Sequence, residues 1–131
     1  MKAIPFRLKP NQDLRLGIET FCQQNKLRSA CILSCVGSLS FARLRMAGAS
    51  EIIEKEGPFE IVSLVGTISQ DGSHFHCSLS NQNGEVWGGH LSKGSLIYTT
   101  GEIVLGVLED YILKREFDPE TGYPELTVLK T

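Results

Sequence analysis

The sequence lacks the features that mark several large classes of protein. No run of apolar residues approaches the roughly 20 that a membrane-spanning helix needs. The first residues show neither an apolar signal core nor a small-residue cleavage site, so we expect a cytoplasmic protein with no membrane partner. The chain also has no glycine-rich phosphate loop and no dinucleotide-binding fingerprint.

Cysteine is scarce, and its spacing is not typical of a metal or redox site. The 4 cysteines include no Cys-x-x-Cys pair. Cys31 and Cys35 fall in an apolar run, where buried thiols behave as small hydrophobic side chains. In a cytoplasmic protein we expect these thiols to be reduced and structural.

A surplus of positive charge is missing as well. The chain has 13 Lys and Arg against 15 Asp and Glu, which gives a formal net charge of −2. Proteins that hold DNA through its phosphates usually carry a basic surplus. A DNA-binding role would therefore have to rest on a local basic patch.

Strand patterns, in contrast, fill most of the sequence. Leu14, Ile18, Phe21 and Cys22 recur at helical spacing and predict one clear helix over 13–25. The remaining apolar-alternating and β-branched segments, separated by turn residues, predict strands. These strands are expected at 4–8, 29–36, 39–46, 51–55, 59–69, 74–79, 86–91, 96–100, 102–108, 110–117 and 126–129. We therefore expect a single α+β domain over 1–131, with a mainly antiparallel multi-stranded β-sheet packed with one or two helices.

Three local features qualify this pattern. Gly37 and Ser38 indicate either a break or a bulge between two strands. The Gly57-Pro58 pair is typical of a turn. The apolar run 97–108 fits a strand, and it also fits a partly helical segment.

The chain's 3 histidines gather in one short stretch. His74 and His76 are two residues apart, so on a strand their imidazoles point to the same face. His90 follows Gly88 and Gly89, where the absence of side chains allows a close approach to another strand or a ligand. Three neutral imidazoles from two strands would suit zinc with one open coordination position. The alternative is that they satisfy hydrogen bonds in a half-buried pocket or at a subunit seam.

Glycines and carboxylates near these histidines extend the candidate site. Gly88 and Gly89 form either the floor of a ligand pocket or a strand crossing that only glycine tolerates. Glu60 and Glu102 are candidate acceptors that would orient the ligating rings and line the same pocket.

Other residues offer weaker candidates. Arg43 and Arg45 share a strand face and would bind an anion or a nucleic acid, or else form ion pairs with Glu51 or Glu54. Trp87 has no basic and aromatic neighbours to suit it for base stacking, so we expect it to pack in the core or at an interface.

Motifs in a fixed order give the chain a family resemblance. They are Gly37 to Leu44, Glu60 to Gly66, His74-Phe75-His76, Gly84 to Leu91 with its Gly-Gly-His-Leu core, Gly94, and Glu102 to Leu105. Together they resemble the Plants and Prokaryotes Conserved (PPC) domain, in its stand-alone prokaryotic form related to the domain of plant AT-hook proteins. The likeness runs from about Phe6 to Phe117.

The resemblance implies a mixed sheet domain that assembles as a homotrimer. It also implies a DNA-binding or regulatory protein, because plant members act in transcription regulation. Those members bind A·T-rich DNA through an added Arg-Gly-Arg-Pro hook, and this chain contains no such segment.

Two functions therefore follow from the sequence. One is a homotrimeric interaction module of the PPC family with a DNA-binding or regulatory role. The alternative is a zinc-dependent enzyme or small-ligand-binding protein built on His74, His76 and His90. Catalytic residues stay unassigned, and both an enzyme and a non-enzymatic binding protein fit the pattern.

Overall fold

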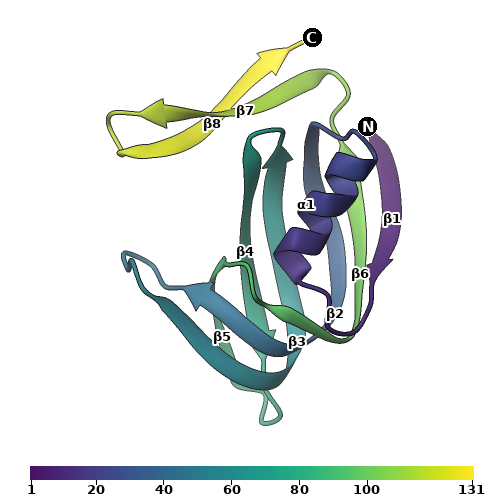
Figure 1. The fold of residues 1–131 in the computed structure, drawn as a ribbon, viewed down its shortest axis with the longest axis vertical. Coiled ribbons are helices and arrows are strands. Elements are labelled where there is room, and N and C mark those ends of the chain that lie inside the picture. The colour runs from purple at the N-terminus through teal and green to yellow at the C-terminus, as the bar shows by residue number, and fades with distance from the viewer.

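The computed structural model describes residues 1–131 as eight strands and one helix (Figure 1). The elements are β1 (Lys2–Leu8), α1 (Leu14–Gln24), β2 (Ser29–Arg45), β3 (Ile52–Ser69), β4 (Gly72–Ser80), β5 (Val86–Leu91), β6 (Leu96–Val107), β7 (Tyr111–Asp118) and β8 (Tyr123–Lys130). Strands β1 to β6 form a sheet in the order β1-β6-β2-β3-β4-β5, whereas β7 and β8 pair only with each other. Every strand pairing is antiparallel, which confirms the predicted α+β class.

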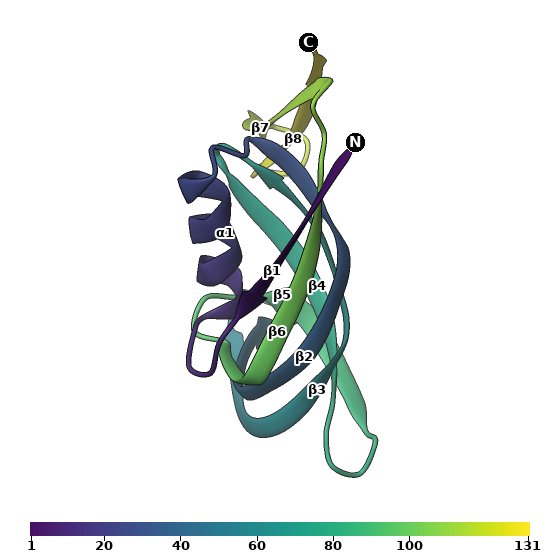
Figure 2. The same cartoon turned by 90° about the vertical axis from the view of Figure 1, so that its right-hand side faces the viewer.

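The six-stranded sheet curls and partly closes on itself. Its two longest strands, β2 and β3, have 17 and 18 residues and bend along their length (Figure 2). The end of β2 also pairs with β5, where Leu44 lies opposite Leu91 and Arg45 lies opposite His90. This closure places the end of β2 beside the end of β5, so β2 shares one surface with the later β4–β5 hairpin.

Helix α1 packs against one face of the curled sheet (Figure 1). The side chain of Asp13 caps it by accepting a hydrogen bond from the Leu16 N–H at 2.9 Å. Leu14, Ile18 and Cys22 lie on its buried side, as the helical spacing predicted. With 11 residues, the helix is too short to traverse a membrane.

Three details of the sequence interpretation are settled by the strand register. The Gly37-Ser38 segment lies within the continuous strand β2, at a shift of its register against β6. A Cβ atom at Gly37 would stand 2.0 Å from the Thr100 carbonyl oxygen on β6, so only glycine fits there. The expected turn at Gly57-Pro58 is wrong, since β3 continues through this cis peptide bond with a shift of register against β2. Residues 97–108 lie in strand β6 and its end, and no second helix forms.

The β7–β8 hairpin projects from the rest of the molecule (Figure 1). Leu113 is its single buried apolar side chain. Its backbone is tied to the sheet at two points: the Leu113 N–H donates to Ser29 Oγ at 3.0 Å, and the Arg115 N–H donates to the Asp71 carboxylate at 3.0 Å. The hairpin is thus anchored at its base and stands beside the start of β4.

Candidate metal centre

Strand β4 presents two histidines outward. Phe75 and Cys77 are buried, whereas His74 and His76, which alternate with them, are exposed. This is the period-two pattern of a strand with one face on the core. The Nε2 atoms of the two exposed rings lie 3.1 Å apart.

His90 joins them through the pairing of β4 with β5. Its Cα lies directly opposite that of His76, so both side chains stand on the same face. One candidate ligand atom from each of the three rings lies within 4.8 Å of the others. The structure therefore brings together the three histidines that the sequence singled out.

The donor set fits a divalent metal ion. Zinc–nitrogen bonds of 2.0–2.1 Å in a tetrahedral arrangement place two ligand atoms about 3.3 Å apart. The 3.1 Å separation of the His74 and His76 Nε2 atoms is close to this value. Other separations in the cluster reach up to 4.8 Å, so a modest ring rotation would complete a three-nitrogen site.

Burial and nearby charges keep His74 and His90 neutral, as metal ligands must be. Burial lowers the pKa of His90 to about 4, helped by the positive charges of Arg45 and Arg15 and by the other two imidazoles. Burial, then His76 and Arg115, also lower the pKa of His74, although Glu125 opposes them. Both rings are therefore uncharged at neutral pH.

His90 has an unmet hydrogen-bonding group. Nη1 of Arg15 lies 3.3 Å from its Nε2, and because a guanidinium only donates, Nε2 is the acceptor. The proton of the neutral ring then sits on Nδ1, which is buried without a partner. An unsatisfied buried donor costs about 1–3 kcal/mol. The pairing of β5 with β4 and β2, and not a hydrogen bond to Nδ1, therefore holds this ring in the cluster.

Arg15 reaches the cluster from helix α1. Its guanidinium donates to the Leu91 carbonyl at the end of β5 and to the Ser73 carbonyl at the start of β4, each at 3.0 Å. Glu19, one helical turn later, pairs with it at 3.1 Å and also accepts a hydrogen bond from the Ser73 hydroxyl. Arg15 thus connects the two strands that carry the histidines.

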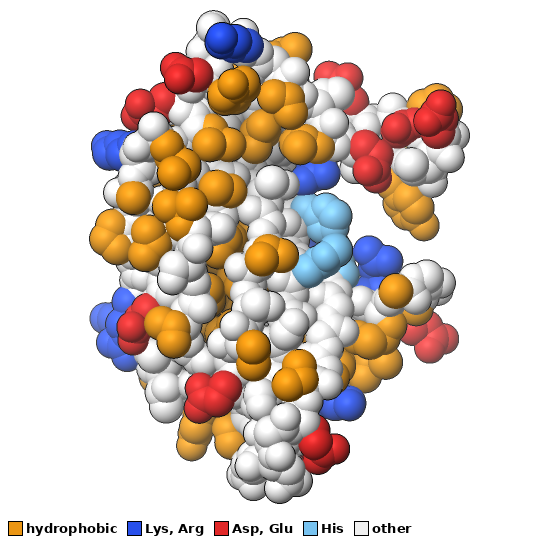
Figure 3. Space-filling model, turned by 180° about the vertical axis from the view of Figure 1, so that it is seen from behind, with side chains coloured by type: hydrophobic (Ala, Val, Ile, Leu, Met, Phe, Trp, Pro, Cys, Tyr) orange, Lys and Arg blue, Asp and Glu red, His pale blue; other side chains and the backbone are white.

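A cleft of about 500 Å³ opens beside the histidines. In Figure 3 the histidine surface forms the floor of a notch, with basic side chains next to it and the projecting hairpin above. The residues that line the cleft come from α1, β2, the β2–β3 and β3–β4 turns, β4, β5 and the hairpin. They are Arg15, Arg45, Gly48, Asp71, Gly72, Ser73, His74, His90, Arg115, Tyr123, Pro124 and Glu125.

The two predicted pocket glycines lie next to this cluster. Gly88 and Gly89 line a second hollow of about 390 Å³ together with Arg45, His76 and His90. A Cβ atom at Gly88 would stand 2.4 Å from the Cys77 carbonyl oxygen, and one at Gly89 would stand 2.7 Å from that of Arg45. The close strand contact is therefore present, and the same glycines line a hollow, whereas their role in a ligand pocket stays a prediction.

The predicted carboxylates lie elsewhere. Glu60 is exposed on β3 and lines a separate hollow with Tyr98 and Thr99. Glu102 is exposed on β6, where its carboxylate accepts a hydrogen bond from Thr100. Neither lines the hollows beside the histidines, because strand order places both carboxylates away from the β4–β5 pair.

The two predicted arginines have different roles. Arg43 pairs with Glu54 at 3.0 Å and donates to the Lys93 carbonyl, so its charge is used within the structure. Arg45 lies opposite His90 and lines both hollows beside the histidines.

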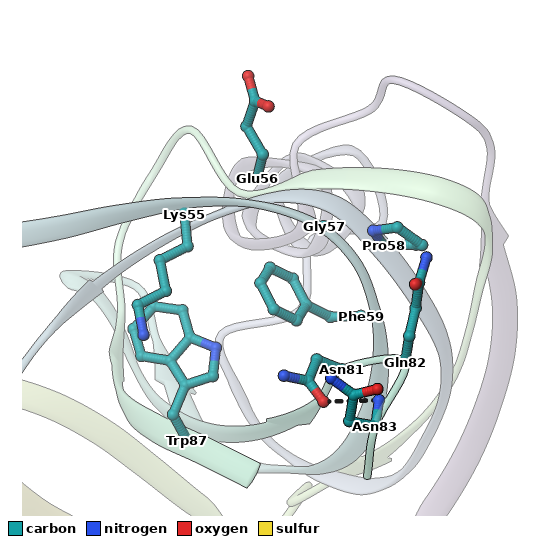
Figure 4. A pocket seen from close by; sticks show the side chains of 9 residues that line it. All are labelled: Lys55, Glu56, Gly57, Pro58, Phe59, Asn81, Gln82, Asn83 and Trp87. Atoms are coloured by element: carbon teal, nitrogen blue, oxygen red, sulfur yellow. Dashed lines mark hydrogen bonds between the residues drawn. The ribbon is translucent and has the colours of Figure 1, made fainter. Parts of the chain in front are cut away.

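Trp87 belongs to a different hollow, of about 340 Å³, formed with Asn81, Asn83 and the β3 segment around Pro58 (Figure 4). Its ring packs at 6.0 Å from the Phe59 ring, and the Lys55 ammonium lies 4.4 Å above it. The indole is therefore covered by the chain's own residues, in agreement with the packing role expected from the sequence.

Sequence reasoning missed Arg15 and Arg115. Arginine on the polar side of a helix or on a strand is usually solvated, so neither residue has a distinctive local signal. Between 58 and 76 residues separate Arg15 from its cleft partners. Only the tertiary fold brings these arginines to the histidines.

The fold and this cluster define a class of small antiparallel α+β domains with three histidines on one sheet face. Residues 1–109 match the model of the Plants and Prokaryotes Conserved domain, abbreviated PCC or PPC. The chain belongs to this family, which confirms the resemblance of its motifs.

Curated relatives are much longer proteins. The chain is 44% identical over 130 residues to the bifunctional protein GlmU of Synechococcus sp. (strain JA-3-3Ab), covering 99% of this chain and 21% of that protein. It is 36% identical over 104 residues to AT-hook motif nuclear-localized protein 3 of Arabidopsis thaliana, covering 72% of this chain and 26% of that protein. The chain thus spans about a fifth to a quarter of the length of these relatives.

Solved structures share the whole fold. A hypothetical protein from Salmonella cholerae-suis superposes with a TM-score of 0.96 at 36% identity, covering 98% of this chain and 94% of that one. A protein from Archaeoglobus fulgidus, described as metal-containing, superposes with a TM-score of 0.80 at 30% identity, covering 97% and 94%.

Proposed function

We propose that this protein binds a divalent metal ion, zinc by preference, through His74, His76 and His90. The bound metal would coordinate a small-molecule ligand in the adjacent cleft. The observation that carries the proposal is the convergence of three imidazoles within 4.8 Å on one face of β4 and β5. Imidazole nitrogen is a preferred zinc ligand, and three protein ligands leave one position open. The metal-containing relative from Archaeoglobus fulgidus supports the same assignment.

The chain's own residues prepare this site in three ways. The strand register holds His76 and His90 opposite each other. Burial and nearby positive charge keep His74 and His90 unprotonated. When bound, zinc would act as a Lewis acid toward an oxygen atom of the ligand.

The direct test is the metal content of the tag-free protein by mass spectrometry. We expect about one zinc per chain in the native protein and loss of at least nine-tenths of it in His90→Ala, since removing one of three ligands leaves too few for tight binding. Ser78→Ala is a matched control, because Ser78 follows His76 on the same strand and bonds Ser63 instead of the cluster. Circular dichroism checks that each variant is folded. No metal in the native protein, even after incubation with zinc, would contradict the proposal.

We also propose that the chain assembles as a homotrimer, as the family resemblance implies. Several apolar side chains on β2 and β3 are about half exposed or more, which is unusual for a monomer of this size. They are Leu33, Val36, Val62 and Val65. Figure 3 shows hydrophobic side chains gathered on the same face as the histidines. Light scattering should give three times the chain mass of 14.4 kDa, and the mass of a single chain would exclude this assembly.

A DNA-associated regulatory role is the second candidate, favoured by the AT-hook relative from Arabidopsis thaliana. The trimer would then act in the cytoplasm as an interaction module. This role predicts affinity for A·T-rich duplex DNA that falls steeply with added salt. Fluorescence anisotropy over a range of salt concentrations tests it, and binding no tighter than that of an unrelated acidic protein would contradict it.

A further inference from the structure

Three arginines from three separate elements line the histidine cleft. Arg15 comes from α1, Arg45 from β2 and Arg115 from β7. Nη1 of Arg15 lies 3.3 Å from His90 Nε2, and Arg45 lies opposite His90 in the strand register. Arg115 lines the same cleft as His74. The cleft has only two carboxylates to set against them, Asp71 and Glu125.

Two of these guanidiniums have no carboxylate partner. The ion pairs of the chain within 4.0 Å are Arg15–Glu19, Arg43–Glu54 and Lys93–Glu19, which leaves Arg45 and Arg115 unpaired. Each is nevertheless oriented by one neutral acceptor. Nη1 of Arg45 donates to the Ala49 carbonyl at 3.3 Å, and Nη2 of Arg115 donates to Thr67 Oγ1 at 2.9 Å. A guanidinium has five N–H donors, so most donors of both groups remain free for a ligand.

The surroundings of the two arginines set them apart from solvated surface charges. Both residues are half-buried. The backbone N–H of Arg115 donates to the Asp71 carboxylate, and this bond turns the carboxylate toward the hairpin. Arg45 is fixed by its pairing opposite His90. Unpaired, oriented and partly desolvated guanidiniums suit the bidentate recognition of a carboxylate or a phosphate.

We propose that Arg45 and Arg115 form an oxyanion-binding subsite beside the three histidines, and that the ligand of this protein is a small molecule with a phosphate or carboxylate group. The inference rests on the proposed metal site, since the same ligand would occupy the open coordination position. A volume of about 500 Å³ suits a small molecule and is within the range of known ligand pockets. Arg115 lies beyond residue 109, where the match to the family model ends, so the two arginines come from different parts of the chain.

Calorimetric titration of the zinc-loaded protein with inorganic phosphate, and separately with acetate, tests the subsite. Arg45→Gln and Arg115→Gln should each weaken the binding of the preferred anion about tenfold or more, because each removes a charge-assisted hydrogen bond. Neither should change the zinc content, as neither residue ligates the metal. Arg43→Gln is the matched control, two residues from Arg45 on the same strand but already paired with Glu54.

The possible outcomes distinguish a failure of the subsite proposal from a failure of the metal proposal. Equal anion affinity in the native protein and in both arginine variants, or no anion binding at all, would overturn the subsite, whereas one zinc per chain would still support the metal proposal. Arginine-dependent binding by a protein that takes up no zinc would support the subsite and overturn the metal proposal. Binding of either anion that both arginine substitutions weaken supports the subsite, and the tighter of the two anions identifies the group that it recognises.

Discussion

The sheet body (residues 1–109) and the β7–β8 hairpin (residues 111–130) are stabilised in different ways. The body encloses a core of 19 buried apolar residues that lie between Leu8 and Leu105. The hairpin adds only Leu113 to the buried apolar residues and leaves Phe117 and Tyr123 largely exposed. The hairpin is therefore held by its own ladder and a few anchoring bonds, whereas packing holds the body.

The two regions also divide the candidate site. The body supplies the three histidines on paired strands, and strand register fixes their positions. The hairpin supplies Arg115, Tyr123 and Glu125 as one wall of the cleft. Rigid strands suit metal ligands, which need fixed geometry. The lightly anchored hairpin suits a cleft wall whose position adjusts to the ligand.

The largest expected difference between the regions is in core packing. Phe75 lies between His74 and His76, and its side chain is 0% exposed. Phe75→Ala should lower the free energy of unfolding by about 3–5 kcal/mol, because it leaves a cavity under β4. Phe117→Ala, an equal truncation at a residue 69% exposed in the hairpin, should change it by no more than about 0.5 kcal/mol. Urea denaturation measures both, and similar losses would contradict the division into a packed body and a peripheral hairpin.

A smaller effect should follow from the strand contact beside His90. Gly88→Ala places a methyl group 2.4 Å from the Cys77 carbonyl oxygen, so β5 must shift away from β4. We expect a loss of about 1–3 kcal/mol and weaker zinc binding, because the shift separates His90 from His76. Val86→Ala, at an exposed position on the same strand, is the control and should leave zinc binding unchanged. A Gly88→Ala protein with normal stability and zinc content would show that the close contact is not needed.

The body was more predictable from the sequence than the hairpin's role was. Period-two alternation around Phe75 correctly placed His74 and His76 on one face, because burial of the other face fixes it. The pairing of His90 with His76 depends on register between strands, and the position of Glu60 depends on strand order. Alternation within one strand reveals neither. Arg115 escaped notice because its contact with Thr67 joins residues 48 positions apart.

The titration of His90 gives a pH-dependent effect that is confined to the body. In the metal-free protein, burial and the nearby arginines lower the pKa of His90 from the usual 6.5 to about 4. Between these values the unfolded chain binds a proton that the folded chain does not, so the free energy of unfolding should fall as the pH drops from about 6.5 to about 4. His90→Gln should flatten this slope, whereas Phe117→Ala in the hairpin should keep it. Chemical denaturation in the presence of a chelator, repeated across this pH range, measures the slope. An identical slope in His90→Gln would mean that the ring is not held in the desolvated, cationic surroundings that the fold creates around it.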